Sequence, residues 1–171
     1  DLIAKMSEET KSKALILDHH DPVKIDSPYA VNLNPELYGY SGERDVSGST
    51  ATYLLMREVV DVRDSAWMAV VGSAEIPGPL AGLNQIPLED SMSVGDVEIK
   101  IGREESYNVK IFNKPWNKLS SILTAIGSIG YYRNGPYKVI NYLLSRRIEF
   151  EEAEKLEEER KNRFNQLFSI L

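Results

Sequence analysis

Leu15-Ile16-Leu17-Asp18-His19-His20-Asp21-Pro22 runs from three large aliphatic residues directly into a polar string that a proline closes. An aliphatic run without polar alternation is typical of a strand buried on both faces, as in a parallel sheet. Ligands of open α/β sheets bind beyond the carboxyl ends of the strands. We therefore expect an α/β fold with a parallel sheet, and a site that contains Asp18, His19 and His20.

The two histidines of the chain both lie in this stretch, side by side. A carboxylate combined with imidazole suits a divalent metal of the manganese or zinc type, whereas magnesium favours oxygen ligands alone. The same string is also compatible with a plain turn, because Asp accepts backbone N–H groups well and forms Asx caps. These residues alone leave the metal site and the turn as alternatives.

The composition of the chain narrows the class of protein. Its 171 residues predict one domain or a little more, and 42% hydrophobic residues are enough for a core. The absence of cysteine excludes disulfides and thiolate metal sites, and it fits a reducing, intracellular (cytoplasmic) compartment. The sequence has no apolar run of membrane-spanning length and no signal-peptide pattern, so we expect no membrane association. The opening residues resemble the middle of a helix and lack an initiator methionine, so we expect a fragment or a missing upstream part.

The charge of the chain is concentrated near its end. The net charge is −6, and residues 149–160 hold seven acids and two bases. Strong sequence-independent binding of nucleic acid is therefore not expected, and binding at a metal or along a local groove is left as an alternative.

Periodicity and capping residues predict the remaining elements. A helix is expected over residues 1–11 with Leu2, Ile3 and Met6 as its apolar side, and another begins at 45–50 with Ser47 or Ser49 as its N-cap. The start of that second helix also offers N–H groups to a phosphate. The other expected elements are a short strand at 29–33, a helix at 66–72, a surface loop or interaction segment at 75–93, strands at 97–101 and 108–112, helices at 119–126 and 137–144, and a long charged helix from 148.

Residues 15–22 resemble the third motif of the DHH phosphoesterases, most of all the RecJ-type members of archaea. The resemblance continues at residues 31–35, 38–42 and 45–54 and returns more faintly at 123–131. It implies a partial, parallel-sheet DHH domain over residues 1–147, followed by a charged connector or partner-binding helix over 148–171.

In such enzymes two metal ions, often manganese, activate water for attack on a phosphodiester. The resemblance implies that Asp18 and His19 are metal ligands and that His20 is a catalytic residue that orients ligand or phosphate. It also implies that the start of the second helix, made of Ser47, Gly48, Ser49 and Thr50, lies close to the substrate phosphate.

The chain departs from the family pattern in its other ligands. The first two aspartate motifs would lie upstream of Asp1, and Glu75 is the nearest carboxylate to the position of the fourth. Two or three ligands would hold a divalent ion poorly. The missing ligands favour a catalytically degenerate protein without a metal cofactor. The resemblance to RecJ-type members then implies a replication protein that binds the GINS complex and joins the archaeal MCM helicase as a structural subunit. We expect its partner to dock on residues 75–112 or on the terminal helix.

Two alternatives remain. One is an active single-strand exonuclease or phosphodiesterase with two manganese ions, single-stranded DNA as its substrate and its first motifs upstream. The other is an unrelated α/β domain with a chance Asp-His-His.

Overall fold

The computed structural model of the chain describes residues 2–77, 80–101, 107–111 and 114–128, together with Lys155, Glu158 and Asn162. It divides into two compact units, Asp1–Asn113 and Lys114–Leu171. The predicted boundary at 147/148 and the predicted helix at 137–144 lie outside the described residues. Lys155, Glu158 and Asn162 are helical and exposed, in the segment predicted to be a charged helix.

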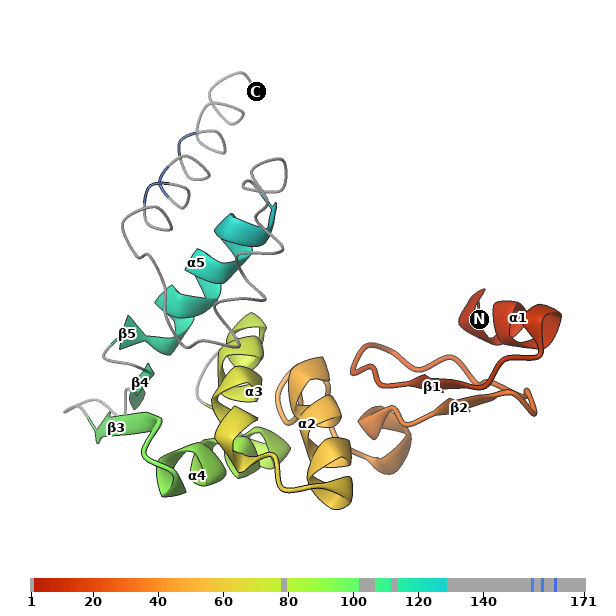
Figure 1. Ribbon diagram of the computed structural model, residues 1–171, viewed down its shortest axis with the longest axis horizontal. Helices are drawn as coiled ribbons and strands as arrows, with labels where there is room; N and C mark the ends of the chain where they lie inside the picture. Colours follow the sequence, from red (N-terminus) through yellow and green to blue (C-terminus); the bar gives the residue numbers. More distant parts are fainter. Residues whose placement is uncertain are drawn as a thin grey trace. The chain divides into compact units, whose positions relative to one another are not determined.

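The first unit mixes helices and strands, as the sequence predicts (Figure 1). Its elements, in chain order, are α1 (Leu2–Thr10), β1 (Ala14–Ile16), β2 (Ala30–Asn32), α2 (Gly48–Val59), α3 (Ala66–Gly72), α4 (Gln85–Ser93), β3 (Val97–Ile101) and β4 (Tyr107–Ile111). Among the described residues of this unit, 3-10 turns lie at Pro35–Tyr38, Arg63–Ser65, Ser73–Glu75 and Gly82–Asn84. The second unit contains β5 (Lys114–Pro115) and α5 (Trp116–Ser128), which includes the helix predicted at 119–126.

The strand region, residues 2–34, is built on a parallel pair of strands. β1 pairs with β2 in the register Ala14↔Ala30, Leu15↔Val31 and Ile16↔Asn32, which confirms the predicted parallel arrangement. α1 contacts both strands, and its buried residues are Ala4 and Ser7. The chain therefore leaves β1 and β2 in the same direction, so that Asp18 and Asn34 follow the strands at the same edge.

The predicted burial of β1 on both faces is wrong. Leu15 is 49% exposed and its register partner Val31 is 56% exposed, so this face of the pair is open. The predicted apolar side of α1 is also exposed, with Ile3 at 48% and Leu2 at 71%. A continuous aliphatic run allows a strand to be buried on both faces. Whether each face is buried depends on which other elements pack against the strand.

The helical region, residues 46–94, contains a well-packed core. Figure 1 shows α2, α3 and α4 grouped together, and α3 contacts both of the other helices. Trp67 and Val70 of α3 are fully buried. The Tyr53 hydroxyl of α2 donates to Asp90 Oδ2 of α4 at 2.7 Å, and Arg57 Nε pairs with the same carboxylate at 2.8 Å. Side-chain contacts therefore tie α2 to α4 across 37 positions of sequence.

Residues 75–93 are not simply the predicted surface loop, because Gln85–Ser93 forms α4. Pro87 lies in the first turn of this helix, where its missing N–H would have no intrahelical partner. Pro87, Leu88 and Ser91 are buried, so α4 contributes to the core. The prolines and weak periodicity of this segment hid the helix from sequence analysis.

The strands predicted at 97–101 and 108–112 are confirmed as β3 and β4. They form an antiparallel pair with Val97 opposite Ile111. Within the described part of the chain, no helix is both long and apolar enough to cross a bilayer.

Candidate functional site

Asp18 organises the turn that follows β1. Its Oδ1 accepts the backbone N–H of His19 at 2.8 Å and that of His20 at 3.3 Å. The same oxygen lies 2.6 Å from His20 Nδ1. Asp18 is thus both an Asx-type cap and one side of a carboxylate–imidazole pair. The structure shows the turn, and the metal site stays a prediction.

The pair between Asp18 and His20 shifts the pKa of both groups. Burial raises the pKa of Asp18, but the hydrogen bonds from the His20 side chain and from two backbone N–H groups outweigh it, so that the pKa is lowered. The hydrogen bond and the charge of Asp18 raise the pKa of His20, whose side chain is 76% exposed. The His20 ring also lies against the His19 ring, with 4.3 Å between their centroids.

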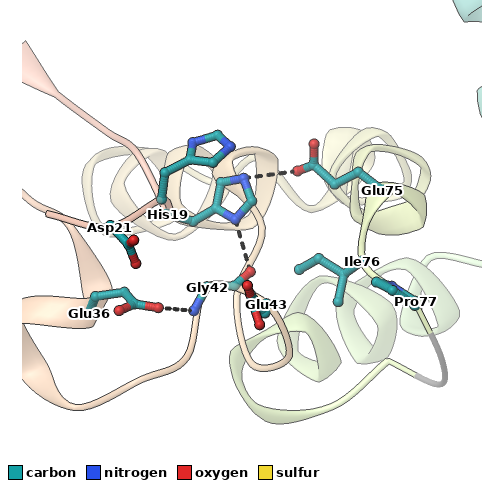
Figure 2. Close-up of a pocket in the computed structure, with 9 residues that line it drawn as sticks. His19, Asp21, Glu36, Gly42, Glu43, Glu75, Ile76 and Pro77 are labelled. Atoms are coloured by element: carbon teal, nitrogen blue, oxygen red, sulfur yellow. Dashed lines mark hydrogen bonds and ion pairs between the residues drawn. The ribbon is translucent and has the colours of Figure 1, made fainter.

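The His19 side chain faces Glu75 of the helical region (Figure 2). Its Nδ1 is 2.9 Å from the carbonyl oxygen of Gly42, and its Nε2 is 3.4 Å from Oε1 of Glu75. The Gly42 N–H in turn donates to Glu36 Oε1 at 2.7 Å. A Cβ atom at Gly42 would collide with the His19 carbonyl, so only glycine fits at this close approach.

Asn34 fixes the loop on the other side of the turn. Its side chain donates to the His20 carbonyl oxygen at 2.7 Å and accepts from the Glu36 N–H at 2.9 Å. Asn34 is 2% exposed and caps the 3-10 turn that carries Glu36. The Asn-Pro part of the resemblance therefore has a local structural role in holding Glu36 near Gly42.

The predicted phosphate-binding residues, at the start of α2, do not all offer their side chains to a ligand. Ser47 is the N-cap of α2, and its hydroxyl, like that of Thr50, is fully buried in a hydrogen-bonded group with Ser73 and Asn84. A Cβ atom at Gly48 would lie 3.5 Å from the His19 ring, so the helix start is adjacent to the histidine. The backbone N–H groups of the first turn, rather than the Ser47 and Thr50 hydroxyls, are the part that could meet a phosphate.

The pocket beside His19 has a volume of about 680 Å³ and an acidic lining. Its charged and imidazole residues are His19, His20, Asp21, Glu36, Glu43 and Glu75. Such a lining attracts cations and repels a bare phosphate. The sequence does not predict that Asp21, Glu36 and Glu43 share a site, because acids in a loop have no characteristic spacing before the fold brings them together.

Three potential ion ligands lie together at the Asp-His-His turn, and two of them, His19 and His20, line the pocket. Among the described residues, ligand atoms of Asp18, His19 and His20 lie within 4.8 Å of one another, and Glu75 faces His19. The carboxylates of Asp21, Glu36 and Glu43 also line the pocket, but among the described residues none of them belongs to that group. Glu75 meets this group only through His19, so one ion would be held either by His19 and Glu75 or by His19 with Asp18 and His20.

Comparison with known proteins places few constraints on function. A search against models of protein families found no match. The uncharacterized protein MJ0831 of Methanocaldococcus jannaschii is 34% identical over 101 residues, which are 56% of this chain and 23% of that protein. The chain therefore matches less than a quarter of the length of this relative.

Proposed function

We propose that this chain is part of a RecJ-like protein of the DHH phosphoesterase type that has lost two-metal catalysis. It acts inside the cell as a GINS-binding structural subunit of an archaeal MCM helicase assembly. The family assignment rests on the resemblance of residues 15–54, and the loss of catalysis rests on the ion donors of the pocket.

The composition of the ion-binding pocket is the observation that carries this proposal. Two-metal phosphodiester hydrolysis needs ligands that hold both ions about 3.5–4 Å apart. The described residues offer the Asp18–His19–His20 group and Glu75, and Asp18 Oδ1 already holds the turn through three contacts. One ion in this pocket would act as a structural centre or hold a phosphate, without the second ion that two-metal hydrolysis requires.

An active manganese-dependent single-strand exonuclease or phosphodiesterase is the second candidate. The observation that favours it is the position of His19, whose Nε2 faces an acidic pocket beside the start of α2. This function requires further carboxylates from residues outside this sequence. Single-stranded DNA would then be the substrate.

A nuclease assay of the full-length protein, with manganese and single-stranded DNA, separates the two candidates. We expect no metal-dependent release of nucleotides, and retention of the chain on immobilised GINS complex. Asp18→Ala removes the centre of the turn, and Asp26→Ala, at an exposed aspartate outside the pocket, is its matched control. Hydrolysis that is lost in Asp18→Ala and kept in Asp26→Ala would refute the structural role and establish the nuclease.

The docking surface expected at residues 75–112 can be tested without deleting the segment, since deletion would remove the core residues of α4. Met92 is 45% exposed near the end of α4, and Met56 is 43% exposed near the end of α2. Met92→Asp should weaken retention on GINS by about tenfold or more if the methionine is a central contact. Met56→Asp is the control, and equal retention of both variants would remove the α4 surface from consideration.

A further inference from the structure

A chain of three contacts leads from Glu36 to the ion-binding pocket. Glu36 Oε1 accepts the Gly42 N–H at 2.7 Å, the Gly42 carbonyl contacts His19 Nδ1 at 2.9 Å, and His19 Nε2 lies 3.4 Å from Glu75 Oε1. Figure 2 shows the three contacts as one continuous path across the pocket. Glu36 and Glu75 thus lie at opposite ends of a path that passes through the His19 ring.

The direction of the hydrogen bonds fixes the proton on His19. A carbonyl oxygen only accepts, so the His19 nitrogen facing Gly42 must carry the hydrogen. In the neutral ring Nε2 then has a free lone pair. The N–H and C=O of Gly42 flank a single Cα, so a carboxylate that holds the N–H also restricts where the carbonyl points.

The lone pair of Nε2 faces the carboxylate of Glu75, which is also electron-rich. Two such groups 3.4 Å apart repel each other unless a proton or a cation lies between them. For metal–ligand bonds of about 2.0–2.1 Å at the tetrahedral angle, two donor atoms are roughly 3.3–3.4 Å apart. The spacing of His19 and Glu75 therefore matches one edge of a tetrahedral, zinc-class site.

We propose that Glu36 is a positioning residue which, through the backbone of Gly42, holds the His19 ring in one orientation and one tautomer, so that Nε2 and Glu75 form an edge that binds one divalent ion. Glu36 does not touch the ion. Its role resembles that of the carboxylates that orient metal-binding histidines, except that a backbone group is inserted between them. The effect of Glu36 on ion binding rests on the single-ion pocket of the proposed function. Its effect on the orientation and tautomer of the His19 ring does not.

The full chain without added metal provides the first test. Nitrogen-15 NMR of the two histidine rings, at a pH where His19 is neutral, distinguishes the tautomers. We expect the Nδ1–H form for His19 in the wild type, a mixture or the Nε2–H form in Glu36→Ala, and recovery in Glu36→Gln, whose amide oxygen still accepts from Gly42. Glu43→Ala is the matched control, since Glu43 is an exposed acid that lines the same pocket.

Titration with Zn²⁺ alone, followed by calorimetry, provides the second test. We expect Glu36→Ala to bind Zn²⁺ about 10–100-fold more weakly than the wild type, with recovery in Glu36→Gln. Glu43→Ala should lose less than Glu36→Ala, because only the general negative charge of the pocket changes. Circular dichroism of each variant shows whether the fold is retained, and a weaker Zn²⁺ affinity in an unfolded variant counts against the role of Glu36.

The outcomes separate this role from the proposed function. An Nε2–H tautomer in the wild type, or an unchanged ring in Glu36→Ala, would refute the positioning role. A wild type that binds no Zn²⁺ would refute the ion-binding edge and the single-ion pocket together, and the ring would then be judged by its tautomer alone. Retention on GINS is expected to be the same for the wild type and Glu36→Ala, so its loss in both would count against the proposed function only.

Discussion

The strand region and the helical region differ in which side chains they bury. In the helical region even polar groups are buried, and Ser47, Thr50 and Ser73 are fully enclosed while making hydrogen bonds to one another. In the strand region large apolar side chains such as Leu15 and Val31 are about half exposed. The comparison indicates that the helical region is the well-buried framework of the unit. The strand region carries the Asp-His-His turn, and its strands are less buried.

The core of the helical region should show the largest effect on stability. Trp67→Ala removes a fully buried ring from α3, and we expect it to lower the free energy of unfolding by about 3–5 kcal/mol. Leu15→Ala, at a position 49% exposed, should cost less than about 1.5 kcal/mol, because part of its transfer term is already absent. Urea unfolding of both variants measures the difference. Equal losses would show that the open face of β1 is covered in solution.

The buried cluster of hydrogen-bonded polar side chains in the helical region should show an intermediate effect on the free energy of unfolding. Asn84 is 1% exposed, and its Oδ1 accepts the Ser47 N–H at 3.0 Å. Asn84→Ala leaves that N–H buried without its partner, which should cost about 1–3 kcal/mol in the same unfolding measurement. Gln85→Ala changes an exposed amide next to it and is expected to cost less than about 0.5 kcal/mol. A loss no larger for Asn84→Ala than for Gln85→Ala would contradict this account of the core.

The Asp-His-His turn should show the smallest effect, because the pair between Asp18 and His20 is exposed. The pKa of His20 is raised above its ordinary value of 6.5, so its stabilising contribution is complete below the unfolded pKa and is lost as pH rises through the folded pKa. The pKa of Asp18 is lowered, so its contribution is present above the unfolded pKa and is lost as pH falls through the folded pKa.

An NMR titration of the His20 ring measures this effect. We expect the pKa of His20 to fall toward its ordinary value in Asp18→Asn, which keeps the size of the side chain and removes its charge. Asp21→Asn is a control at the neighbouring aspartate, whose charge is a weaker cause of the shift. A larger change in Asp21→Asn than in Asp18→Asn would show that the hydrogen bond to Asp18 is absent in solution.

Local signals in the sequence predicted much of the fold. Capping residues and periodicity predicted an N-cap at Ser47 or Ser49, the apolar helix α3, the short strand at 29–33 and the two later strands. The structure confirms these elements and selects Ser47 as the N-cap. The candidate site was predicted in part, because Asp18, His19 and His20 are adjacent in sequence. Their individual roles remain predictions.

Contacts between residues far apart in the chain could not be predicted from the sequence. Gly42 meets His19 across 23 positions, and no spacing rule links Glu36 to a histidine ring. The buried state of the Ser47 and Thr50 hydroxyls depends on Ser73 and Asn84, which come from other elements. The helix α4 was missed because a proline in its first turn weakens the pattern that reveals helices.

The carboxylate of Asp90 accepts a hydrogen bond from Tyr53 and pairs with Arg57, and these contacts should affect how α2 and α4 unfold locally. Burial and the hydrogen bond to Asp90 raise the pKa of Tyr53, so the hydroxyl keeps its proton and its bond over the working pH range. α2 and α4 should consequently unfold as a single cooperative segment. Their amide protons would then exchange with deuterated solvent at one shared rate, and Asp90→Asn would let α4 exchange ahead of α2.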